Sequence, residues 1–115
     1  MIEHRLITAL RQKGIHATLS LDTDRESFAV VTRSGQTRSY YDVNLGFKLK
    51  EYDLYLACYS TSRSSASEMI ELIIDTAEEL SFEDDIVSME VIGSAQLPEL
   101  AGKPGFSVSL GISTY

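Results

Sequence analysis

Apolar and polar residues alternate over residues 41–49, and this alternation constrains the fold more than any other stretch of the chain. The apolar positions are Tyr41, Val43, Leu45, Phe47 and Leu49, and the positions between them are Asp42, Asn44, Gly46 and Lys48. Successive side chains of a strand point to opposite faces, so a period of two predicts a strand with one buried face. Residues 52–60 and 106–112 alternate in the same way. A turn at Lys50–Glu51 is expected to join 41–49 and 52–60 into an antiparallel hairpin.

Helical periodicity appears in two segments instead. Residues 2–13 predict a short amphipathic helix that stops at Gly14. Ser65 and Glu68 fit a capping box, which predicts the start of a longer helix running to Leu80. Its apolar stripe is Ala66, Ile70, Ile73, Ala77 and Leu80, and its acidic side is Glu68, Glu71, Asp75, Glu78 and Glu79. Such a helix buries one side and leaves the acids in solvent.

The remaining segments complete a single α+β domain over residues 1–115. Short strands are predicted at 16–21, 27–32 and 86–92, with a turn at 33–38 and a loop at 93–105 that holds both prolines. We expect a mainly antiparallel sheet of about five to six strands, with two helices packed on one face. The other face is expected to carry Tyr40, Tyr55, Tyr59 and the serines of the last strand, and to suit a neighbouring subunit as its cover.

Charge is distributed unevenly along the chain, whose net charge is −7. Residues 1–63 hold nine basic and seven acidic side chains, a net of +2. Residues 64–115 hold one basic side chain, Lys103, and ten acidic ones, a net of −9. An acidic surface of this size repels nucleic acid and attracts a basic partner surface. We therefore expect no sequence-specific nucleic-acid binding.

Composition also predicts the setting of the protein. A single cysteine excludes an internal disulfide framework and favours a reducing compartment. The sequence has no apolar run long enough for a membrane helix, and its first residues lack the order of a signal peptide. The expectation is a soluble protein, cytosolic at synthesis, with no membrane partner.

The segment CYSTSRSSASEMIELII, residues 58–74, is the main candidate for chemistry, because it holds Cys58, Arg63 and six hydroxyl residues. A phosphate cradle needs glycine, and a serine nucleophile needs a nearby base, and the segment offers neither. We interpret it as a strand passing into a helix, with loose anion binding by Arg63 as the alternative. Cys58 is expected to be buried.

Candidate metal ligands are equally weak. His4 and His16 lack metal-pair spacing. Asp22, Asp24 and Glu26 lack the glycine and closing glutamate of a calcium loop. The acidic cluster 83–85 fits a solvated surface better than a divalent site. We therefore predict no catalytic residues, no cofactor and no metal.

The order of elements resembles a known group of proteins. A hairpin ends in YLACYS, the polar junction TSRSS follows, and the acidic helix ASEMIELIIDTAEEL precedes two further strands. This pattern is similar to that of the small tail-completion and tail-terminator proteins of long-tailed bacteriophages, including the minor capsid or tail-to-head joining group. The resemblance runs from Ile2 to Ile112 and lies in pattern and length.

The resemblance implies a structural virion protein and not an enzyme. Such proteins form rings, commonly hexameric, that cap the tail tube and join it to the head-side connector. The implied partners are further copies of the chain, the tail-tube protein and the connector or neck protein. The implied location is the tail or neck of the virion, reached after assembly in the host cytoplasm.

Three regions are predicted to form the interfaces: the acidic helix side, the turn 33–38 and the loop 93–105. The residues proposed are Glu71, Asp75, Glu78, Glu79, Arg33, Arg38, Leu97, Glu99 and Lys103. A rival interpretation is a small acidic inhibitor that presents carboxylates in place of phosphates to a DNA-binding protein. A third is a ligand-binding or enzyme domain that uses the hydroxyl cluster.

Overall fold

The computed structural model describes residues 2–21, 23–42 and 47–115, except for the side chains of 34–38, 40–42 and 47–48. Its elements are α1 (Ile2–Gln12), β1 (Ala17–Thr18), β2 (Phe28–Asp42), β3 (Phe47–Tyr59), α2 (Arg63–Leu80), β4 (Ile86–Leu100) and β5 (Lys103–Thr114). The strands form one five-stranded sheet in the order β1-β2-β3-β5-β4. Only β1 and β2 are parallel, and the other neighbours are antiparallel. The predicted α+β class and mainly antiparallel sheet are therefore confirmed.

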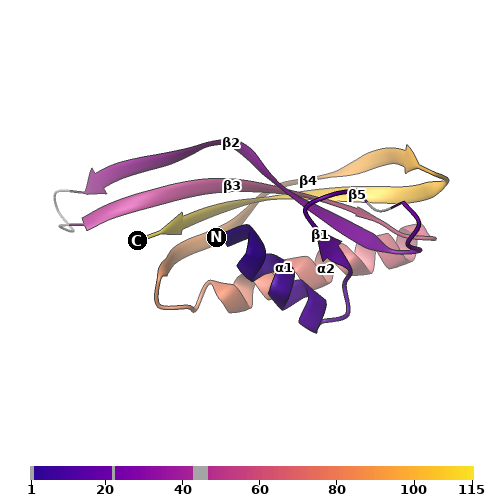
Figure 1. Cartoon of the computed structure of the whole chain (residues 1–115), viewed down its shortest axis with the longest axis horizontal. Coiled ribbons are helices and arrows are strands. Elements are labelled where there is room, and N and C mark those ends of the chain that lie inside the picture. The colour runs from indigo at the N-terminus through magenta and orange to yellow at the C-terminus, as the bar shows by residue number, and fades with distance from the viewer. Residues whose placement is uncertain (1, 22, 43–46) are drawn as a thin grey trace.

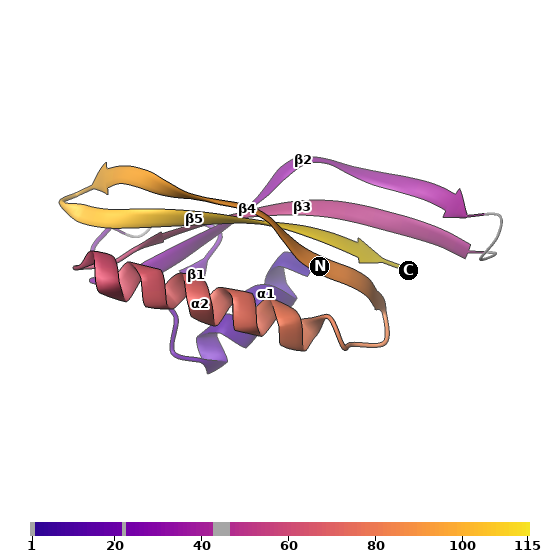
Figure 2. The ribbon, with the colours of Figure 1, turned by 180° about the vertical axis from the view of Figure 1, so that it is seen from behind.

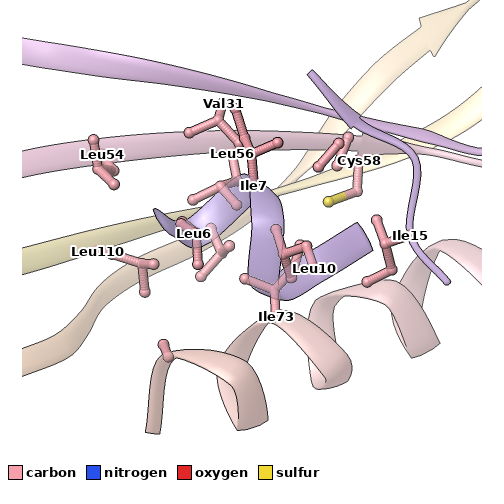
Figure 3. Close-up of a cluster of buried hydrophobic side chains, with 14 of the residues drawn as sticks. Leu6, Ile7, Leu10, Ile15, Val31, Leu54, Leu56, Cys58, Ile73 and Leu110 are labelled. Carbon is pink, nitrogen blue, oxygen red and sulfur yellow. The ribbon is translucent and has the colours of Figure 1, made fainter. Parts of the chain in front are cut away.

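Both helices lie on the same side of the sheet, and the other side has no helix on it (Figures 1 and 2). The core lies between the helices and the sheet. Figure 3 shows α1 in its middle, with α2 below and the strands above. Fully buried members are Leu6 and Leu10 of α1, Ile73 of α2, Leu54, Leu56 and Cys58 of β3, and Leu110 of β5. Burying each of the larger aliphatic side chains stabilises the fold by about 1.5–3 kcal/mol.

The strands are much longer than the helices that cover them. A strand of 15 residues spans about 50 Å, whereas the 18 residues of α2 span about 27 Å. The molecule is accordingly elongated, with extents of 50 × 25 × 20 Å. In Figure 1 the β2–β3 hairpin runs past α1 at the left. We call this projecting part, residues 38–42 and 47–51, the hairpin arm. The residue pattern did not predict this projection.

The predicted strand over 41–49 is wrong. Asp42 pairs with Phe47 and Tyr41 with Lys48, so β2 ends and β3 begins inside the alternating stretch. Positions 43–46 lie outside the described residues. The alternation of apolar and polar residues shows which side chains share a face, but it does not show where one strand ends and the next begins.

The two turns predicted nearby are also wrong. Residues 33–38 stay within β2, where a register shift between Ser34 and Arg38 marks a bulge. Lys50 and Glu51 lie inside β3, paired with Ser39 and Arg38. The inward positions predicted for β3 are confirmed, since Leu54, Leu56 and Cys58 are all fully buried. Burial on one face was therefore easier to predict than the ends of the strands.

The predicted loop at 93–105 is wrong as well. β4 continues to Leu100, which pairs with Lys103 across a two-residue turn. Pro98 is tolerated because β4 is an edge strand, whose outer side has no ladder hydrogen bond to lose. A register shift between Leu97 and Leu100 accommodates it. The candidate docking loop is thus the end of a strand.

The turn itself carries backbone strain. Ala101 has φ 51° and Gly102 has φ 76°. Two positive φ values are typical of the type I′ hairpin turn, which suits glycine and asparagine. Alanine in this region costs roughly 1 kcal/mol.

Ala101→Asn is therefore expected to raise the free energy of unfolding by about 1 kcal/mol, because asparagine tolerates positive φ. Urea denaturation followed by circular dichroism would measure the change. The matched control is Ala95→Asn on the same strand, where asparagine is unfavourable and should lower stability slightly. A loss at position 101 as large as that at 95 would contradict the turn geometry.

Helix α2 begins three residues earlier than the capping box predicts. Ser62 is the N-cap, and its hydroxyl oxygen accepts a hydrogen bond from the Ser65 backbone N–H at 3.1 Å. The helix then buries its apolar stripe as expected, with Ala66, Ile73 and Ala77 buried and the neighbouring Met69 buried beside them. The predicted helix at 2–13 is confirmed as α1, and the strand at 16–21 shrinks to the two residues of β1.

Candidate interaction surfaces

Three of the six hydroxyl residues in the segment 58–74, Ser60, Ser62 and Ser65, make hydrogen bonds within the fold. Ser62 and Ser65 form the cap of α2, and their hydroxyl oxygens lie 3.1 Å apart. Ser60 is fully buried, and its hydroxyl lies 2.7 Å from that of Ser27. The interpretation as a strand passing into a helix is confirmed for these residues, which contact one another and the backbone.

Cys58 has no exposed surface. Burial raises the pKa of its thiol to about 12. The thiolate is the reactive form of cysteine, so this side chain stays protonated and inert at neutral pH. The expected burial of Cys58 is confirmed.

The candidate metal ligands are His4, His16, the acids of 22–26 and the acidic cluster 83–85. Within the described ranges, no group of three or more His, Cys, Asp or Glu side chains is placed to hold a metal ion. Asp85 accepts a hydrogen bond from Arg5 at 2.6 Å, which holds the pKa of this carboxyl below its usual value. Glu83 and Asp84 are exposed, and Asp22 lies outside the described residues.

One hollow in the described part of the chain has a volume of about 640 Å³. It lies where the end of α1, residues 24–27 and the start of α2 meet. His16 and Ser65 both line it, together with charges of both signs from Lys13, Asp24, Arg25 and Glu68. The Ser65 hydroxyl oxygen accepts a hydrogen bond from the Ser62 hydroxyl at the cap of α2.

The acidic side of α2 is one exposed surface. Glu71, Asp75 and Glu78 are exposed, as their helical spacing predicts. Glu79 accepts a hydrogen bond from Lys13 Nζ at 2.8 Å, so one of the four carboxylates predicted for an interface is paired within the chain. No helix in the described part of the chain has the length and apolar character needed to cross a membrane.

The basic residues predicted for the interface are used inside the fold. Arg33 Nη2 donates to Glu3 of α1 at 2.6 Å, and its guanidinium lies 4.9 Å from the centre of the Tyr52 ring. Lys103 Nζ donates to the Thr23 carbonyl at 2.9 Å. The Arg38 side chain lies outside the described residues. Arg33 and Lys103 therefore join distant segments of one chain.

The sheet face that carries no helix, which we call the open face, has two different regions. At one end Tyr59 stacks on Phe28 at 5.4 Å between ring centres and covers Gly105, where an added Cβ would approach the ring to 2.5 Å. Further along, a hollow of about 260 Å³ is lined by acids and small residues. Its acidic members are Glu51, Asp53 and Glu90. The open face is thus aromatic at one end and acidic beside the hairpin arm.

The two edges of the sheet are long and uncovered. β4 is the last strand in the described sheet, and its exposed apolar side chains are Val87 (40%), Val91 (42%) and Ile92 (54%). Leu97 is half-buried and Glu99 exposed near its end. At the opposite edge, β1 pairs only with Ala29 and Val30 of β2. Within the described residues, the rest of β2 has no strand on its outer side.

The structure does not bring the nine predicted interface residues together. The acids of α2 lie in the helical layer, Arg33 lies near the middle of β2, and Leu97, Glu99 and Lys103 lie near the β4–β5 turn. Sequence reasoning missed the edge strands because it placed a loop at 93–105. No known protein family matches the sequence, and no curated protein sequence matches it either. Function is therefore inferred from the order of the elements, the charges and the exposed edges.

Proposed function

We propose that this chain is a structural protein of a long-tailed phage virion. It forms a ring at the head-proximal end of the tail, caps the tail tube and joins it to the head connector. The order of elements supports this role. A short helix, a long antiparallel hairpin, a long helix and a second hairpin follow one another along the chain, which is the order that the resembled tail-completion and tail-terminator proteins share.

The observation that carries the proposal is the uneven covering of the sheet. Both helices lie on one side, and the strands extend about 50 Å along the molecule. In a single copy no helix covers the open face, and within the described residues no strand lies beyond β4 or beyond most of β2. Proteins usually protect long sheet edges. Surfaces of this kind suit a subunit that is completed by its neighbours.

Charge separation supports contacts between unlike surfaces. Helix α2 carries Glu68, Glu71, Asp75, Glu78 and Glu79 against a single basic residue, Arg63, a net of −4. The strands of the hairpin arm carry three basic residues, Arg38, Lys48 and Lys50, against two acids, Asp42 and Glu51, a net of +1. Two unlike surfaces on one subunit favour head-to-tail contacts, which form a ring when the rotation between copies closes. Six copies is the number that the resemblance implies.

The rival is a small acidic inhibitor that imitates the charge of DNA. The exposed carboxylates of α2 favour it. These acids follow one helix, however, and Glu79 and Asp85 are already paired with Lys13 and Arg5. A protein that imitates double-stranded DNA needs two rows of negative charge across its surface. The structural role is therefore the better proposal.

Light scattering after size-exclusion chromatography, with electron microscopy of mixtures containing tail tubes, tests the proposal. The tubes are assembled from the tube protein of the same phage. We expect closed rings of the free protein, or density at one end only of each tube. A monomer or dimer at every concentration that leaves both tube ends bare would overturn the proposal. Displacement of a DNA-binding protein from DNA by such a monomer would favour the inhibitor instead.

A further inference from the structure

We propose that copies of this chain join edge to edge, with the outer edge of β4 in one copy pairing with the outer edge of β2 in the next. The five-stranded sheet then continues from copy to copy. This inference rests on the proposed ring, because it names the contact that would build it. The contact itself is a separate claim with its own test.

Both edges are open over lengths that can pair. β4 has fifteen residues at one margin of the sheet. At the other margin β1 pairs with only Ala29 and Val30, so within the described residues Val31–Asp42 of β2 has no strand paired on its outer side. Unpaired N–H and C=O groups along an edge are a template for a strand from another chain. In peptide recognition such pairing supplies affinity through main-chain hydrogen bonds.

Strand direction allows the contact to repeat. Each of the pairs β2–β3, β3–β5 and β5–β4 is antiparallel, so β4 runs opposite to β2. A second copy placed beside the first without being turned over therefore presents its β4 antiparallel to β2. The helices of all copies then stay on the same side of the continued sheet. Repetition of one contact gives a chain of subunits that closes if the rotation permits.

Charge selects this pairing over the two symmetric ones. β4 carries Glu90 and Glu99 and no basic residue, whereas β2 carries Arg33 and Arg38 against one acid, Asp42. Two β4 edges would bring acids together. Two β2 edges would bring two copies of Arg38 together, whereas Arg33 is already paired with Glu3 of its own chain. Like charges across strands destabilise a pair, and opposite charges stabilise it. The second copy is thus the occupant that complements both edges.

The exposed apolar side chains of β4 and the irregularities near its end determine which of its residues are expected to pair with the next copy. Val91 and Ile92 are 42% and 54% exposed on β4, and pairing along this strand would cover them. Pro98 and the register shift between Leu97 and Leu100 guard the end of β4. A further shift between Val91 and Gly93 adds twist. We expect residues 91–97 to pair with the end of β2 around Ser39, with Ser94 opposite Ser39 and the guarded end of β4 left free.

Cysteine cross-linking between the two edges tests the contact. Ser39 of β2 pairs with Lys50 and Ser94 of β4 pairs with Val108, which places both exposed serines on the helix side of the sheet. The double variant Ser39→Cys/Ser94→Cys, treated with a short bismaleimide, is expected to give a ladder of covalent multimers. The natural thiol, Cys58, is buried and adds no background. Gln96→Cys in place of Ser94→Cys samples a second register on the same side.

Matched variants separate the possible contacts. Ser39→Cys/Thr8→Cys is the control, because Thr8 is exposed on α1 beside the end of α2 and not on a strand, and it should give no ladder. Mixing the two single variants should give one cross-linked dimer that contains one chain of each. Circular dichroism would establish that each variant keeps the parent fold. Cross-linking should also fall at high salt, because screening weakens the attraction between the edges.

The outcomes distinguish this contact from the proposed function. A dimer from Ser94→Cys alone, or from Ser39→Cys alone, would show a symmetric edge contact and overturn the inference. Rings in light scattering with no ladder from either double variant would overturn the edge contact and leave the ring in place. A ladder from chains that never close and never bind tube ends would support the contact and overturn the ring function.

Discussion

Ile73→Ala is expected to lower the free energy of unfolding by about 2–5 kcal/mol. Ile73 has no exposed surface and lies in the centre of α2, where Figure 3 places it beside Leu10 of α1. Truncation removes buried apolar surface and leaves a cavity between the helices, because neighbouring backbones cannot close it. Urea denaturation followed by circular dichroism would measure the loss.

The next residue along the helix provides the matched control. Ile74→Ala makes the same chemical change at a side chain that is 37% exposed. Its loss should stay below about 1 kcal/mol, because little of the removed surface is buried. Equal losses at positions 73 and 74 would mean that α2 presents a different side to the sheet.

The second large effect is expected at the ion pair between Arg33 and Glu3. Glu3 is only 4% exposed, and Arg33 reaches it with Nε at 3.1 Å and Nη2 at 2.6 Å. Arg33→Met removes the positive charge and keeps an apolar side chain over Tyr52. We expect a loss of about 3 kcal/mol, because a buried carboxylate without its partner retains its desolvation cost. Thermal and urea unfolding would measure this loss.

A double-mutant cycle isolates the pair. Glu3→Leu/Arg33→Met removes both charges and should recover most of the stability that Arg33→Met loses, since buried ion pairs replaced by apolar residues are often neutral. Additive losses for the two single changes would contradict coupling between these side chains. An effect of Arg33 variants on assembly would have to be compared with their effect on folding, because the side chain stabilises the subunit itself.

Periodicity predicted the parts of the fold that depend on burial. Ile73 and Ala77 of α2 and Leu54 and Leu56 of β3 are buried where the spacing placed them. A one-sided element must repeat its apolar residues at its own structural period, so this signal survives in a single sequence. The two helices and the inward face of β3 could therefore be predicted.

Strand ends could not be predicted in the same way. Local signals favoured turns at 33–38 and at Lys50–Glu51, but pairing with distant strands keeps both segments extended. Pro98 likewise predicts a strand end from local sequence alone, but β4 continues through it because this strand lies at the edge of the sheet. Edge position is a property of topology, and neighbouring residues do not encode it. Gly102, shortly before the alternating stretch 106–112, was a local turn signal at the second hairpin.

The predicted interface residues illustrate the same limit. Arg33 bonds to a residue 30 positions away, and Lys103 bonds to one 80 positions away. Charge alone does not tell whether a basic side chain meets another chain or another part of its own. The exposed acids of α2 were predictable, because helical spacing separates them from the buried stripe.

The acidic hollow on the open face has a consequence for any closed assembly of this sheet. Carboxylates lie on both sides of the sheet. Those of α2 lie on the helical side, and those of Glu51, Asp53 and Glu90 lie on the open face. A cylinder made by curling the continued sheet has one of these sides inward, whichever way it curls. Its bore is lined with negative charge in either case, so a polyanion threading it would meet a wall that does not hold it.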